Sequence, residues 1–98
     1  MKVVWSRSAI GQLQSIYDYI ARDSEQYALR MVDRLTRKSE RIVEQNESGQ
    51  IVPEYDDRSI REILEGSYRI IYVSRDETIT ILAIIHGARL LPDLTDLQ

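Results

Sequence analysis

Three runs rich in β-branched and aromatic residues, joined by two short connections, constrain the fold of this chain more than any other feature. The runs span residues 59–64, 68–74 and 78–86, and three residues separate each run from the next. Connections this short join antiparallel neighbours, because a parallel crossover needs about a dozen residues or more. The sequence therefore predicts an antiparallel meander of three strands.

An amphipathic helix is predicted near the start of the chain. Ser6 or Ser8 supplies an N-cap, and apolar residues then recur at intervals of three and four until about Arg22. This spacing places them on one side of a helix. The residues of that apolar face are Ile10, Leu13, Ile16, Tyr17 and Ile20.

A second, longer helix follows within two or three residues. Asp23 or Ser24 begins it, and Gln26 stands three residues after Asp23, as in a capping box. Its apolar face is predicted to extend to Val43. Two helices joined so closely form an antiparallel hairpin.

The remaining segments complete an α+β fold. Residues 1–5 are typical of a strand that pairs in parallel with a later one, whereas residues 46–57 are predicted to be a loop. Helices followed by a run of strands indicate a helical hairpin packed on one face of a mostly antiparallel sheet, which leaves the other face available. We expect one domain over residues 1–98, with a loosely ordered segment from 87 to 98.

Composition narrows the chemistry. The 98 residues include no cysteine and a single histidine, which excludes thiol nucleophiles, thiolate zinc sites and His-rich metal sites, and we expect no cofactor. With 13 basic and 16 acidic residues the net charge is −3, whereas dedicated nucleic-acid binders usually have a basic excess. No apolar stretch reaches the roughly 20 residues that span a bilayer, and no signal peptide is visible. We therefore expect a cytoplasmic protein.

Arg69 is the most informative single residue. It lies in the middle of the second β-rich run, where a charge is costly unless it is paired or reaches solvent. A structural salt bridge with Glu54 or Glu62 and a role in binding or catalysis are both compatible with this position.

Other candidate residues lie near it along the predicted sheet. Arg61, Arg69, His86 and Arg89 would form a basic patch suited to a phosphate or a carboxylate. His86 is the most obvious candidate for proton transfer, although a histidine at a strand end is more often solvated or hydrogen-bonded. Glu54 or Glu62 could also serve as a base, although pairing with arginine is the commoner role of such a residue. Tyr19 is out of phase with the apolar face of its helix, so we expect it to be exposed and available to a partner.

Several of these residues belong to motifs that are distinctive in combination. They are Arg-Glu-Ile-Leu at 61–64, Tyr-Arg-Ile-Ile-Tyr-Val at 68–73 after Gly-Ser, and a last run, 79–89, that closes in His-Gly-Ala-Arg. With these motifs, and with Trp5, Ala9 and Leu13 near the start, the chain resembles the ParE/RelE superfamily of bacterial toxins, and ParE-like members in particular. The resemblance covers nearly the whole chain and implies the fold derived above.

The resemblance implies the toxin of a type II toxin–antitoxin module, neutralised by an antitoxin whose carboxy-terminal segment wraps around it. We expect no direct binding of operator DNA by this chain. ParE-like members act on DNA gyrase and block replication, whereas RelE-like members cut mRNA in the ribosomal A site. A third interpretation is a member that has lost toxicity and remains an antitoxin-binding partner.

Differences from the RelE-like pattern favour gyrase. Ile60 and Glu62 stand where those enzymes carry lysines, and the tail after Arg89 has no tyrosine. The net negative charge also suits a ribosomal site poorly, because phosphate contacts dominate such binding. In the alternative, a ribosome-dependent endoribonuclease, Arg69 and Arg89 would hold the scissile phosphate and His86 would move a proton.

Overall fold

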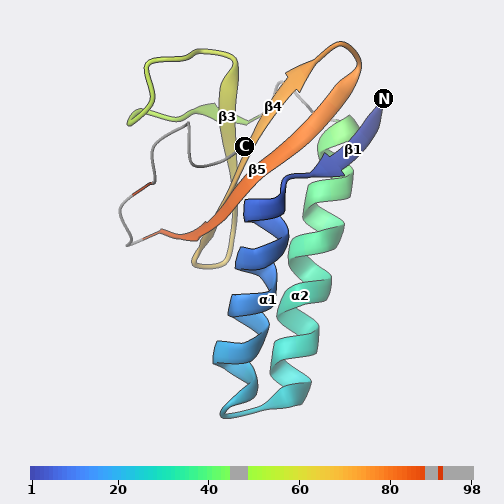
Figure 1. Cartoon of the computed structure of the whole chain (residues 1–98), viewed down its shortest axis with the longest axis vertical. Helices are drawn as coiled ribbons and strands as arrows, with labels where there is room; N and C mark the ends of the chain where they lie inside the picture. Colours follow the sequence, from blue (N-terminus) through green and yellow to red (C-terminus); the bar gives the residue numbers. More distant parts are fainter. Residues whose placement is uncertain (45–48, 88–90, 92–98) are drawn as a thin grey trace.

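Two helices and a five-stranded sheet make up the computed structural model, which describes residues 1–44, 49–87 and 91 (Figure 1). The elements are β1 (Lys2–Trp5), α1 (Arg7–Ala21), α2 (Glu25–Glu40), the 3₁₀ helix η1 (Arg41–Glu44), β2 (Gln50–Ile51), β3 (Ile60–Glu65), β4 (Tyr68–Arg75) and β5 (Thr78–His86). The predicted α+β fold and the helical hairpin are confirmed. Most of the segment expected to be loosely ordered, residues 87–98, lies outside the described residues.

The sheet has the strand order β1-β5-β4-β3-β2. β3, β4 and β5 form the predicted antiparallel meander, and β1 pairs in parallel with β5, also as predicted. The expectation of a continuous loop over 46–57 was wrong, because Gln50 and Ile51 pair antiparallel with Glu62 and Arg61. A two-residue strand is too short to show an alternating pattern, so nothing in the sequence indicated it.

Serine side chains begin both helices. The Ser6 hydroxyl accepts a hydrogen bond from the Ala9 backbone N–H, which selects Ser6 over the alternative N-cap. Ser24 accepts from Tyr27 in the same way, so the predicted capping box of Asp23 and Gln26 is not formed. α2 also ends earlier than predicted, since the apolar stretch near Val43 continues in η1.

The sheet has an apolar cluster on each face. The larger cluster fills the space between the helices and the sheet, and its fully buried members include Leu35, Ile70 and Tyr72. The smaller one lies on the outer face, where Val52 and Tyr55 pack over Ile60, Ile71, Ala83 and Ile85. The outer face is therefore not left bare as expected, because the irregular segment 52–59, which we call the strap, covers part of it.

A β-bulge shifts the alternation in β5. The pairing slips between Ile71 and Tyr72, so that Ile81 and Ile84, three residues apart, both reach the larger core. α1 fastens this point, since the Gln12 side chain accepts a hydrogen bond of 2.8 Å from the Ile84 backbone N–H. The helical hairpin is thereby fixed to the sheet at the bulge.

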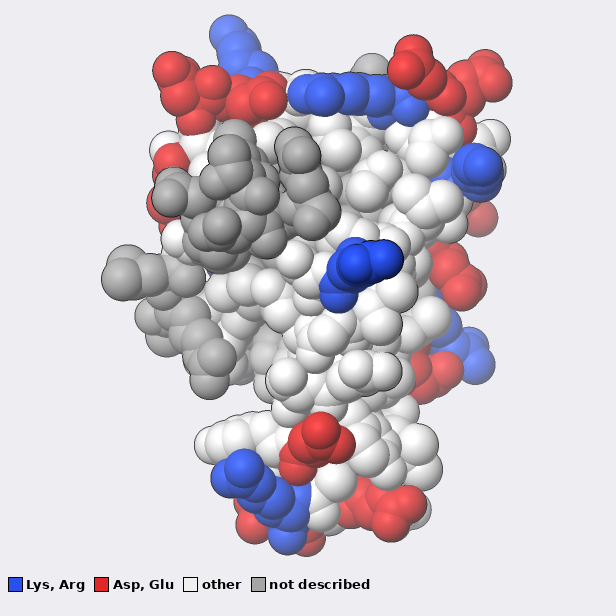
Figure 2. Space-filling model, viewed as in Figure 1, with Lys and Arg blue, Asp and Glu red and all other residues white. Residues whose placement is uncertain are grey.

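One end of the helical hairpin projects beyond the sheet. Figure 1 shows the lower turns of α1 and α2, with the connection between them, extending past the ends of the strands. On the face drawn in Figure 2, acidic and basic side chains are interspersed at the ends and along one edge, and the middle is mostly uncharged. Among the described residues, no helix has the length and hydrophobicity of a membrane-spanning segment.

Candidate functional site

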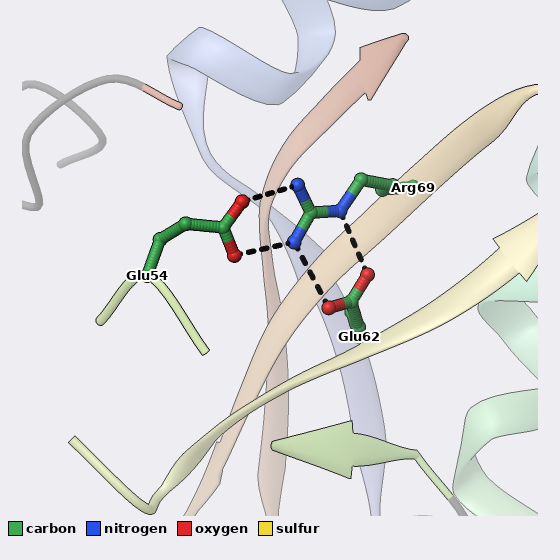
Figure 3. Close-up of polar contacts among 3 residues, drawn as sticks. All are labelled: Glu54, Glu62 and Arg69. Atoms are coloured by element: carbon green, nitrogen blue, oxygen red, sulfur yellow. Dashed lines mark hydrogen bonds and ion pairs between the residues drawn. The ribbon is translucent and has the colours of Figure 1, made fainter. Parts of the chain in front are cut away.

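Arg69 lies at the centre of the only polar cluster buried in the described part of the sheet, a triad with Glu54 and Glu62 (Figure 3). It projects from the second residue of β4 onto the outer face and is 9% exposed. Glu62 reaches it from the neighbouring β3, and Glu54 reaches it from the strap. The predicted salt bridge is formed with both carboxylates at once.

Both contacts are bidentate. Nε and Nη2 of Arg69 donate to the two carboxylate oxygens of Glu62 at 2.7 and 2.9 Å. Nη1 and Nη2 donate to the two oxygens of Glu54 at 2.8 and 2.9 Å. Four of the five N–H donors of the guanidinium are therefore used inside the chain.

The charges of the triad sum to −1, since one guanidinium faces two carboxylates. The hydrogen bonds that Arg69 donates to Glu54, and then those that it donates to Glu62, raise the pKa of its guanidinium. The same hydrogen bonds lower the pKa of Glu54, so this carboxylate stays ionised to a lower pH than an ordinary glutamate. A phosphate approaching Arg69 would meet a net negative cluster and would have to displace Glu54, whose side chain is 46% exposed.

The triad fastens the strap. Glu54 holds the strap to the sheet near its start. Near the other end, Asp57 accepts hydrogen bonds from the Ser59 backbone N–H and hydroxyl at 2.9 and 2.6 Å, which stabilise the turn before β3. Arg75 lies 3.6 Å from Asp57 and adds an ion pair. The arrangement resembles a structural clamp over the smaller core more than an open binding site.

The other predicted site residues do not join Arg69 in one patch. Arg61 points to the helix-facing side, where its Nη1 donates to the Gly49 carbonyl at 2.9 Å. His86 pairs with Tyr68 across the strands, and their rings meet edge to face at 5.6 Å. Since alternate residues of a strand face opposite sides, both lie across the sheet from Arg69. Arg89 lies outside the described residues.

Tyr19 is exposed as predicted, at 67%, and stands near the end of α1. The guanidinium of Arg22 lies 5.9 Å from the centre of its ring. A second pair of the same kind, Tyr27 with Arg30 at 5.7 Å, occupies the first turns of α2. The involvement of the two arginines was missed, although the repeated Tyr-x-x-Arg spacing can be read in the sequence.

Gly49 is a further residue whose role the sequence did not suggest. A Cβ at this position would collide with the hydroxyl of Tyr72 and would lie 3.0 Å from the Glu62 carbonyl oxygen. Tyr72 is fully buried, and this burial raises the pKa of its phenol. The glycine allows the chain entering β2 to pass close over the tyrosine.

Among residues 1–44, 49–87 and 91, no three side chains of histidine, aspartate or glutamate come together in a way that could hold a metal ion. A cavity of about 350 Å³ lies between the end of α2 and β3. Its charged lining is mixed: Lys38 and Arg41 face Glu44 and Glu62, and the last of these already belongs to the triad.

Comparison with known proteins shows what this chain is similar to. The family described as the ParE toxin of the type II toxin–antitoxin system parDE matches residues 3–91. Toxin RelE2 of Caulobacter vibrioides is 33% identical over 90 residues, which cover 91% of this chain and 98% of that toxin. A solved structure of the chromosomal ParDE system from P. aeruginosa shares the fold with a TM-score of 0.74 at 24% identity, covering 88% of this chain and 95% of that one.

Proposed function

Since the chain belongs to the ParE toxin family of type II toxin–antitoxin systems, we propose that it inhibits DNA gyrase and is held inactive by a cognate antitoxin. The family makes it the toxin component and implies an antitoxin partner. The target, the mode of neutralisation and a cytoplasmic location belong to the proposal.

We choose gyrase as the target because most N–H donors of Arg69 are already occupied inside the chain. An enzyme that cuts RNA must stabilise the negative charge that develops on the scissile phosphate, and an arginine with free donors is suited to this. Here four donors are used by Glu54 and Glu62, and the cluster has a net negative charge. A toxin that acts through a protein contact needs no such phosphate site.

The other candidate catalytic group is also poorly placed for joint action with Arg69. His86 is exposed at the end of β5 and lies on the opposite face of the sheet. Acid–base catalysis needs the proton-transfer group within hydrogen-bond reach of the reacting atoms. An arginine and a histidine on opposite faces do not act on one phosphate without rearrangement of the sheet.

A ribosome-dependent endoribonuclease is the second candidate, because the relative with 33% identity is named RelE2. In that mechanism His86 would move a proton and Arg89 would hold the scissile phosphate. Glu54 would have to release Arg69 when the toxin binds the ribosome. The name of a relative is weaker support than the geometry of the triad.

One experiment with two arms separates the candidates. Purified toxin is added to gyrase and relaxed plasmid in one arm, and to a translating extract with a reporter mRNA in the other. Loss of supercoiling with intact mRNA is the expected result. Cleaved mRNA with normal supercoiling would replace the proposal by the endoribonuclease, and addition of the antitoxin should reverse either activity.

A further inference from the structure

The projecting end of the helical hairpin carries two tyrosine–arginine pairs that the fold itself does not use. Tyr19 with Arg22 and Tyr27 with Arg30 occupy corresponding places on either side of the connection between α1 and α2. The tyrosines are 67% and 51% exposed, and both arginines are exposed. We call these four residues the tip cluster.

Helix geometry places both tyrosines on the sheet-facing side of the hairpin. Gln12 contacts the β5 backbone at 2.8 Å, and Arg34 contacts Glu65 of β3 at 2.6 Å, so these two residues mark that side. Tyr19 stands seven residues after Gln12, and Tyr27 stands seven before Arg34. Seven residues are about two turns, so each tyrosine continues the same side past the end of the sheet.

The opposite side of the hairpin is different in charge and shape. It has a groove of about 240 Å³ lined by Leu13, Tyr17, Asp18 and Val32, among others. Burial and then the Glu25 carboxylate raise the pKa of the Tyr17 phenol, so Glu25 lies on this side as well. The hairpin therefore has a concave, acid-edged groove on one side and protruding aromatic and cationic groups on the other.

We propose that the tip cluster is the surface with which the toxin holds a folded protein target, at a pocket of that target edged by carboxylates. Protruding side chains gain most of their contact area by entering a preformed pocket, which a folded protein provides and a disordered antitoxin segment does not. Tyrosine and arginine dominate such binding sites, and arginine matches carboxylates in a planar, bidentate geometry.

A nucleic acid fits this surface less well. The tip cluster has two basic side chains, Arg22 and Arg30, whereas nucleic-acid binding draws its affinity from many phosphate contacts. The inference rests on the proposed function, which supplies gyrase as the target.

Two double variants test the tip cluster. Tyr19→Ala with Tyr27→Ala removes the aromatic groups, and Arg22→Glu with Arg30→Glu reverses the two charges. Lys2→Glu with Arg7→Glu is the matched control, because it makes the same change in charge at two exposed positions away from the tip. Thermal melts of each variant establish that it is folded.

The three main readouts are affinity for purified gyrase, affinity for the antitoxin, and inhibition of supercoiling. Affinity for plasmid DNA without gyrase is measured beside them. We expect each tip variant to bind gyrase at least about 30-fold more weakly, as for the loss of a binding hot spot. We expect its affinity for the antitoxin to stay within about twofold of the wild type, and the control to match the wild type in all three readouts.

Other outcomes overturn the inference in distinguishable ways. If the wild type binds gyrase and the tip variants bind it equally well, the tip cluster is not the contact, although the proposed function stands. If the variants lose the antitoxin and keep gyrase, the surface belongs to the antitoxin. If charge reversal abolishes binding to plasmid DNA alone, the partner is a nucleic acid. If the wild type does not bind gyrase, the proposed function fails and the inference fails with it.

Discussion

Replacing Arg69 tests the structural role of the triad most severely, because it leaves a buried carboxylate without its cationic partner. In Arg69→Met, Glu62 keeps a carboxylate that is only 10% exposed and loses both of its hydrogen bonds from the guanidinium. Removal of one partner from a buried ion pair costs about 3–5 kcal/mol. Glu54, at 46% exposure, can turn to solvent and adds little.

This loss is large for a chain of 98 residues. A domain of this size has a free energy of unfolding of about 5–15 kcal/mol, and each kcal/mol corresponds to about 4–8 °C in melting temperature. We therefore expect Arg69→Met to melt at least about 12 °C below the wild type. Thermal and urea unfolding at pH 7, followed by circular dichroism, measure both quantities.

A compensating variant makes the argument refutable. Arg69→Met combined with Glu62→Leu removes the stranded carboxylate, and replacing a buried ion pair by apolar groups is often close to neutral. The double variant should therefore recover most of the lost stability. A loss below about 1 kcal/mol for Arg69→Met, or no recovery in the double variant, would show that the triad is not the clamp described here.

Three further predictions concern the strap, the entry to β2 and α1. The pKa of Glu54 is lower in the folded protein than its ordinary value of 4.5. The ionised carboxylate therefore contributes its full stabilisation of the fold above pH 4.5, and this stabilisation is lost as the pH falls through the pKa of the folded state. Glu54→Gln should therefore flatten the fall in urea stability between about pH 5 and pH 3, and an unchanged profile would contradict this. Gly49→Ala should cost about 1–3 kcal/mol, because its Cβ collides with Tyr72. Gly11→Ala, where a Cβ meets nothing within 4 Å, should instead stabilise α1 by about 0.5–1 kcal/mol. Equal effects at the two glycines in urea unfolding would refute the close-packing argument.

Local patterns predicted most of the fold. The spacing of apolar residues in α1 and the short turns around Gly66 and Asp76 have local causes, so the helical hairpin and the meander could be derived from the sequence. β2 could not, because its two residues form a strand only through pairing with β3. The bulge in β5 could not be derived either, because the Ile84 N–H there donates to Gln12 of α1, a residue far away in the sequence.

The candidate site was harder to derive, because it depends on which face of the sheet each side chain takes. Arg69 and its possible partners, Glu54 and Glu62, were identified from burial and charge alone. The joint patch with Arg61 and His86 was inferred from proximity along neighbouring strands, and alternation places these two across the sheet from Arg69. Proximity in the chain could not reveal that the strap would bring a second carboxylate to the guanidinium.

The central claim is that Arg69 serves the structure and is not needed for toxicity. The most direct test compares the wild type with the folded Arg69→Met, Glu62→Leu double variant. Both proteins are assayed for inhibition of supercoiling by gyrase and for cleavage of a reporter mRNA in a translating extract. The account predicts that both proteins inhibit supercoiling to the same degree and leave mRNA intact. Cleavage of mRNA by the wild type that disappears in the double variant, with its fold retained, would contradict it.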